Sequence, residues 1–228
     1  MGNLEFRMVT DKGELDEVYK LRYKVYCEEK GFESPEDHPG GVEIDEYDEN
    51  SVHFIALNDR RHIIGTARLI FNSEKGFPIE KNSKIETDIS GIERSRLGEI
   101  SRLAVSKEYC RRVEDQFIYF GVSEEDSFEI PNIFHDHRRR QLIVLGLYKL
   151  IYIESKKRGC THWFAVMSKG LYLLLRKIGI VFRPIGPAVN YHGLRAPYLG
   201  SVAEIEAAVE RVSPELFRQA REDLRRSM

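Results

Sequence analysis

The order of apolar and polar residues in the first half of the chain predicts a strand, a long helix and then several more strands. Apolar residues spaced three or four apart predict a helix over about 12–30, with Asp11 and Glu14 as its N-terminal capping box. Short apolar stretches between polar turn-forming residues predict strands at 4–9, 52–57, 63–71 and 98–106. The second and third of these strands are joined by a turn at 58–61 and are expected to form a β-hairpin.

The second half of the chain is dominated by one strongly apolar helix. Residues 141–157 are apolar nearly all round, so this helix is expected in the centre of the fold. A loop around 77–80 precedes the last early strand. Further strands are predicted at 161–167 and 181–184, and further helices at 171–178, after Ser201 and after Ser213. This order predicts an α+β fold in which helices pack on a mixed, mostly antiparallel sheet.

Several charged residues occupy positions where the pattern predicts burial. Arg22 lies in the apolar stripe of the first helix, Arg68 lies inside a strand, and Glu99 and Arg102 lie three residues apart on another strand. A buried charge without a partner is costly, so each of these residues needs an opposite charge or a chemical task. Asp45 and Asp48 precede the second strand and could supply the anions, although acids in such a loop can equally form a solvated face. If all six side chains converge, they form a charge-balanced cleft that can bind a zwitterion and hold a carboxylate as a base.

Composition excludes several classes of protein. The chain has 228 residues and a net charge of −2, so no overall basic field favours nucleic acid or a membrane surface. No apolar run reaches the roughly 18 residues that span a bilayer, and no secretory leader is predicted at the N-terminus. The three cysteines are far apart, which favours a reducing, cytoplasmic location without a disulfide framework. His135 and His137 give only a weak metal signal, and no metal is expected.

Linked motifs along the chain resemble known acyltransferases. The order of elements is similar to that of the GNAT acyltransferase fold. The stretches 43–48, 65–69 and 99–103 resemble the E-x-D-x-x-D, G-x-x-R-L and E-x-S-R motifs of the acyl-homoserine-lactone synthases. The stretches 21–33, 161–167 and 191–198 are more similar to the PEP-CTERM/exosortase system-associated acyltransferases, which resemble N-acyl amino acid synthases. The resemblance implies a GNAT-like domain over 1–200 and a helical extension over 201–228 packed on the same domain.

The resemblance, together with the chemistry of the reaction, assigns roles to individual residues. An amine must lose a proton to attack a thioester, and Glu99 is the expected base, held in place by Arg102 in a motif that includes Ser101. The substrate-binding residues are expected to be Arg22, Tyr26, Phe32, Asp45, Asp48 and Arg68. The acyl chain and pantetheine arm are expected to contact Leu103, Ala104, Val105, Arg138, Arg139, Arg140, Trp163 and Met167, although most of the apolar members could be ordinary core.

These roles imply transfer of a fatty acyl group from an acyl carrier protein to the α-amine of an amino acid. The central helix opens without the glycine-rich loop that cradles the pyrophosphate of coenzyme A, so acyl-CoA is the less favoured donor. No permanently bound cofactor is expected. Basic residues near 111–112 and 138–140, or alternatively 156–158, could receive the acidic carrier protein. The alternatives are a homoserine-lactone synthase that consumes S-adenosylmethionine, a GNAT enzyme that uses acyl-CoA, and a non-catalytic acyl-carrier or lipid-binding module.

Overall fold

The computed structural model describes residues 4–106, 137–190 and 193–228. These residues form two compact units. The first contains residues 4–70, 101–106 and 137–150, and the second contains residues 71–100, 151–190 and 193–228. Strand β4 (Leu97–Val105) and helix α3 (His137–Lys157) each contribute residues to both units.

The first unit is built on antiparallel strands. Asp11 caps helix α1 (Lys12–Tyr23), because its Oδ1 accepts the backbone N–H of Glu14 at 2.9 Å, and α1 continues into a π-helical segment up to Glu29. Besides α1 and parts of β4 and α3, the unit holds β1 (Glu5–Met8), β2 (Ser51–Leu57) and β3 (Ile63–Phe71), of which the last residue, Phe71, falls in the second unit. Strand β2 pairs with β1 on one side and with β3 on the other.

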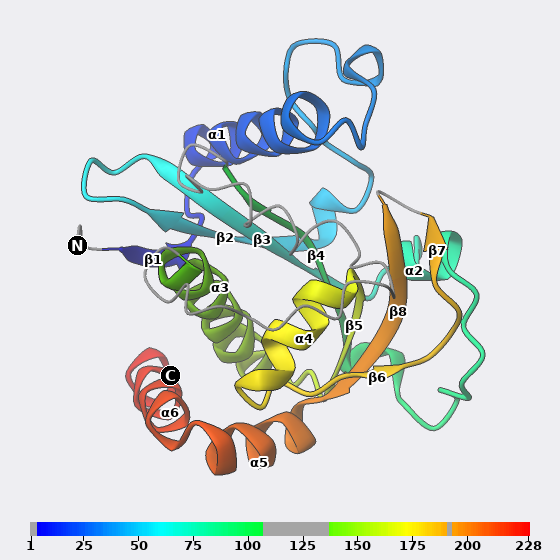
Figure 1. The fold of residues 1–228 in the computed structure, drawn as a ribbon, viewed down its shortest axis with the longest axis vertical. Helices are drawn as coiled ribbons and strands as arrows, with labels where there is room; N and C mark the ends of the chain where they lie inside the picture. The colour runs from blue at the N-terminus through cyan, green and yellow to red at the C-terminus, as the bar shows by residue number, and fades with distance from the viewer. Residues whose placement is uncertain (1–3, 107–136, 191–192) are drawn as a thin grey trace. The chain divides into compact units, whose positions relative to one another are not determined.

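Alternation along β2 decides which helix covers which face of these strands. Ile55 and Leu57 form a buried cluster with Val18 and Tyr19 of α1. On the opposite face, a Cβ atom added at Gly146 of α3 would approach the Phe6 ring to 2.2 Å. Glycine therefore lets α3 lie close against β1, and α1 and α3 cover opposite faces (Figure 1).

The second unit pairs parallel and antiparallel strands. The first half of β4 runs parallel to β5 (His162–Met167), which is antiparallel to β8 (Leu194–Ser201). Strand β8 also pairs with β6 (Arg183–Pro184) and β7 (Val189–Asn190). The helices of this unit, besides part of α3, are α2 (Pro78–Asn82), α4 (Lys169–Lys177), α5 (Val202–Val212) and α6 (Pro214–Ser227).

The predicted fold class is confirmed, with two local errors and two strands that were not predicted. The strands are mixed and mostly antiparallel, and helices flank them. The loop expected around 77–80 is wrong, because Pro78–Asn82 forms the short helix α2. The strand expected at 181–184 is reduced to Arg183–Pro184, and β7 and β8 are strands that the sequence pattern did not predict. Within the described residues, no helix is both long and apolar enough to cross a bilayer.

Candidate active site

Arg22 is the most deeply buried charge in the first unit. Its side chain has no exposed surface, because α1 turns it inward with the apolar stripe. The guanidinium donates to both carboxylate oxygens of Asp48, at 2.7 and 3.2 Å, and its Nε donates to Glu43. Such a two-pronged pairing fixes the geometry of both partners.

Arg68 of β3 occupies the same buried region. Its Nη1 lies 2.6 Å from one oxygen of Asp45 and 2.6 Å from one oxygen of Asp48, and its Nη2 lies 2.9 Å from the second oxygen of Asp45. The Nε donates to the Ser101 hydroxyl at 3.0 Å. Arg68 therefore joins strand β4 to the loop at 43–48, which we call the acidic loop.

Arg102 of β4 completes the group. Its Nε donates to Glu43 at 3.0 Å, its Nη2 lies 3.0 Å from Asp45, and its guanidinium lies over the Tyr26 ring. Together with Arg22, Asp48 and Arg68, these residues make a buried network that we call the ion-pair cluster: Arg22, Glu43, Asp45, Asp48, Arg68 and Arg102.

The backbone of Arg102 is strained in a way that serves the cluster. Its φ of 47° lies in the left-handed region, which costs a residue other than glycine roughly 1 to 3 kcal/mol. Side chains alternate between the two faces of a regular strand, yet Ser101 and Arg102 are consecutive and both bind members of the cluster. The left-handed residue breaks the alternation and brings both side chains to one face.

Backbone groups of the acidic loop hold its carboxylates in place. The Asp45 N–H donates to Asp48 at 2.8 Å, and the Tyr47 N–H donates to Asp45 at 2.9 Å. The Glu43 N–H donates to the Tyr19 carbonyl of α1 at 3.1 Å. The loop is therefore folded around the three arginines and anchored on the helix that carries Arg22.

The arginines keep the acids ionised in spite of burial. Burial alone would raise the pKa of Glu43, but the charges of Arg22 and Arg102 hold it at about 2. Burial also acts to raise the pKa of Asp45 and of Asp48, but the neighbouring arginines lower the pKa of Asp45 and bring that of Asp48 well below its usual range. Beneath the cluster, His53 is 5% exposed, and burial lowers its pKa to about 4, so the ring is neutral at pH 7.

Glu99, the predicted base, belongs to the second unit. It is 2% exposed, and its Oε2 accepts the N–H of Ile79 at 3.0 Å, in the first turn of α2. This contact orients the carboxylate and gives it a helix-capping role of its own. That Arg102 also holds Glu99 stays a prediction.

The remaining predicted residues fall into three groups. Tyr26 donates its hydroxyl to the Leu103 carbonyl at 3.3 Å and lies beside Phe32, with ring centroids 6.2 Å apart. Trp163 and Met167 are 1% exposed and belong to the core of the second unit, and Ala104 and Val105 are buried in β4. Arg140 is 4% exposed and contributes little to any surface patch. The side chains of Arg138 and Arg139, and residues 111–112, lie outside the described part of the chain.

Comparison with known proteins gives the fold a context. The model of the Acetyltransferase (GNAT) domain matches residues 21–119. The solved structure of the acyl-homoserine-lactone synthase LasI superimposes with a TM-score of 0.61 at 18% identity, covering 93% of this chain and 97% of LasI. This chain has the fold of that synthase.

Two further relatives widen the range of activities found with this fold. FeeM, an N-acyl amino acid synthase from uncultured soil microbes, superimposes with a TM-score of 0.57 at 13% identity, covering 91% of this chain and 94% of FeeM. An acyl-homoserine-lactone synthase of Aeromonas hydrophila is 22% identical over 174 residues, which are 75% of this chain and 70% of that enzyme.

Glu43 is the member of the cluster that the sequence analysis missed. It is 1% exposed and is shared by Arg22 and Arg102. The sequence analysis counted Glu99 as the third anion beside Asp45 and Asp48, whereas in the structure Glu43 pairs with Arg22 and Arg102. The signal that could have found it is the first glutamate of the E-x-D-x-x-D motif at 43–48.

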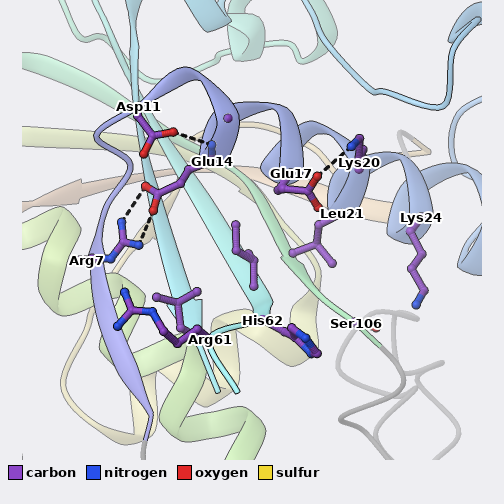
Figure 2. A pocket seen from close by; sticks show the side chains of 13 residues that line it. Arg7, Asp11, Glu14, Glu17, Lys20, Leu21, Lys24, Arg61, His62 and Ser106 are labelled. Atoms are coloured by element: carbon purple, nitrogen blue, oxygen red, sulfur yellow. Dashed lines mark hydrogen bonds and ion pairs between the residues drawn. The ribbon is translucent and has the colours of Figure 1, made fainter. Parts of the chain in front are cut away.

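A separate hollow lies on the other face of α1. It has a volume of about 630 Å³ and is lined by Arg7, Glu14, Glu17, Lys20, Lys24 and His62 among others. Figure 2 shows Arg7 paired with Glu14 and Glu17 paired with Lys20 along its wall. None of the residues predicted for the active site lines this hollow.

Proposed function

We propose that this protein is an N-acyltransferase that moves a fatty acyl group from an acyl carrier protein thioester to the α-amine of an amino acid. The observation that carries the proposal is the ion-pair cluster, which places three arginines and three carboxylates together on a GNAT-like fold. A cluster of this kind suits an acceptor that carries both an ammonium and a carboxylate group.

The proposed reaction is a direct transfer. The amine nitrogen attacks the thioester carbonyl, a C–N bond forms, and the C–S bond breaks. Glu99 accepts the first proton, which the α-ammonium must lose before its nitrogen can attack. The nitrogen loses a second proton once the C–N bond has formed, and this proton passes to the departing sulfur, so that the thiol leaves protonated. A backbone N–H in the stretch from Leu103 to Val105 would stabilise the oxyanion. Direct transfer needs no acyl-enzyme intermediate, and the two described cysteines, Cys27 and Cys160, are buried and have raised pKa values.

The acyl donor is proposed to be a carrier protein. The helix that opens at His137 has no glycine before Gly146, so it lacks the loop that would cradle the pyrophosphate of coenzyme A. A phosphopantetheine arm brings a single phosphate and makes no such demand. Association with the PEP-CTERM/exosortase system and a cytoplasmic location remain predictions from the sequence.

A second candidate function is synthesis of an acyl-homoserine lactone from S-adenosylmethionine. The likeness to LasI and to the enzyme of Aeromonas hydrophila favours it. Phe32 stands where that family has a tryptophan-containing turn, which favours the amino acid as acceptor. Both reactions begin with the same attack of an α-amine on a thioester.

A single assay separates these possibilities. The purified protein is incubated with carrier proteins loaded with different acyl chains, each with one of the amino acids or S-adenosylmethionine, and the products are identified by mass spectrometry. An N-acyl amino acid is expected, and a lactone would move the assignment to the second candidate. Turnover with acyl-CoA alone would refute the assignment of a carrier protein as the acyl donor. Binding of the acylated carrier without any product would identify a non-catalytic module.

A further inference from the structure

The residues of the ion-pair cluster differ sharply in access to solvent. The side chains of Arg22 and Arg68 are 0% and 1% exposed, whereas that of Arg102 is 11% exposed. Among the acids, Glu43 and Asp48 are 1% and 3% exposed, whereas Asp45 is 23% exposed. Within the cluster, the accessible residues are therefore one cation, Arg102, and one anion, Asp45. Glu33, whose side chain is 22% exposed, lies outside the cluster but 3.7 Å from Arg102 at the same edge.

The guanidinium of Arg102 is fixed on one side only. Its Nε and Nη2 bind Glu43, and its Nη2 also lies 3.0 Å from Asp45 and 3.7 Å from Glu33. Its Nη1 donates no hydrogen bond to the described residues. Packing over the Tyr26 ring and the left-handed backbone of Arg102 hold this group in one orientation.

From this arrangement we infer that Arg102 and Asp45 are the two residues of the cluster that contact the acceptor. Arg102 binds its α-carboxylate through Nη1, and Asp45 binds its α-ammonium. Arg22, Arg68 and Asp48 do not touch the substrate, and Glu43 is a positioning residue that holds Arg102. This inference rests on the proposed function, but it applies equally to an amino acid and to S-adenosylmethionine, because both carry the same head group.

The assignment has a consequence for turnover. Acylation converts the ammonium into a neutral amide, which no longer attracts the carboxylate of Asp45. The product then keeps the contact with Arg102 and loses the contact with Asp45. An N-acylated amino acid without a long chain should accordingly bind more weakly than the free amino acid.

Equilibrium binding tests the assignment without requiring catalysis. L-methionine, L-methioninamide and N-acetyl-L-methionine are titrated into the full-length protein by calorimetry, since they differ only at the carboxylate or the ammonium. L-methionine is expected to bind at least about tenfold more tightly than either derivative, as a lost charged hydrogen bond predicts. Equal affinities for all three, or no binding of L-methionine by the wild-type protein, would overturn the inference.

Variants assign each contact to its residue. Arg102→Gln is expected to reduce the preference for L-methionine over the amide to less than about twofold, and Arg102→Lys to restore part of it. Asp45→Asn should remove the preference over N-acetyl-L-methionine instead. Glu43→Gln should weaken the binding of L-methionine and leave a smaller preference over the amide. Arg60→Gln, an exposed arginine of the β2–β3 turn in the same unit, is the matched control and should change nothing.

The outcomes separate this inference from the proposed function. The inference is contradicted if the Arg102→Gln variant unfolds at the same temperature as the wild type and keeps its full preference for L-methionine over L-methioninamide. This holds even if acyl transfer proceeds. If the variants lose their binding preferences as expected but the wild-type protein transfers no acyl group to any acceptor, the inference is supported and the proposed activity is refuted.

Discussion

Helix α1 carries two sets of ion pairs on two faces, and they differ in what surrounds them. On the inner face, Arg22 is fully buried and shares Glu43 and Asp48 with other arginines. On the outer face, Lys20 and Glu17 are 58% and 59% exposed and pair with each other (Figure 2). Both sets pair a basic residue with carboxylates, and the largest difference between them is burial, which decides how strongly each pair can fix the structure. Substitutions that break each set in turn should therefore lower the free energy of unfolding by different amounts.

The largest effect is expected for Arg22→Met. The substitution leaves Glu43 and Asp48 buried with fewer counter-charges, which typically costs about 3 to 5 kcal/mol. Urea unfolding at pH 7 measures the loss in the free energy of unfolding. A loss below about 1 kcal/mol would mean that the inner face behaves like the outer one.

The next largest effect is a loss in the free energy of unfolding at low pH, and it is caused by the neutral His53 beneath the cluster. The groups facing it are Asp48, whose Oδ1 lies 3.5 Å from its Nε2, the ring of Tyr19, and the charges of Arg22, Arg68 and Asp45. Its folded-state pKa is about 4, below the ordinary value of 6.5, so the unfolded chain takes up a proton first as the pH falls. Stability is therefore lost between pH 6.5 and about 4, by up to about 3 kcal/mol.

The measurement is the slope of the unfolding free energy against pH. Between pH 6 and 5, the wild type should show an extra slope of about 1.2 kcal/mol per pH unit relative to His53→Gln. The comparison of slopes is independent of any stability that the substitution itself removes. Identical slopes would show that His53 takes up a proton in the folded state as readily as in the unfolded chain.

The smallest effects are expected on the outer face. Glu14→Gln breaks the pair with Arg7, whose side chain is 28% exposed, and should cost less than about 1 kcal/mol. Glu17→Gln should cost still less, because both partners are solvated. Urea unfolding of both variants beside Arg22→Met gives the comparison directly, and losses above about 2 kcal/mol would erase the distinction between the two faces.

What could be predicted from the sequence follows from the length and clarity of each pattern. Arg22 and Arg68 stand out because a charge interrupts an apolar stretch, whereas Glu43 lies among polar neighbours and gives no such signal. Strand β8 was missed because Pro197 and Gly200 interrupt it, and α2 is too short to show a helical period. The left-handed backbone of Arg102 has no sequence signal, since arginine rarely adopts it, and only the contacts of the folded chain select it.

The central claim is that the protein joins an acyl group to an α-amine and that Glu99 accepts the proton. Glu99→Gln tests it most directly, because glutamine can still accept the N–H of Ile79 and keep the fold while it cannot act as a base. Wild type and variant are assayed side by side by mass spectrometry, with acylated carrier protein and the acceptor that the wild type uses. The account predicts a fall in kcat of about 100-fold or more with little change in thermal unfolding. Product formation at the wild-type rate by a folded Glu99→Gln protein would contradict it.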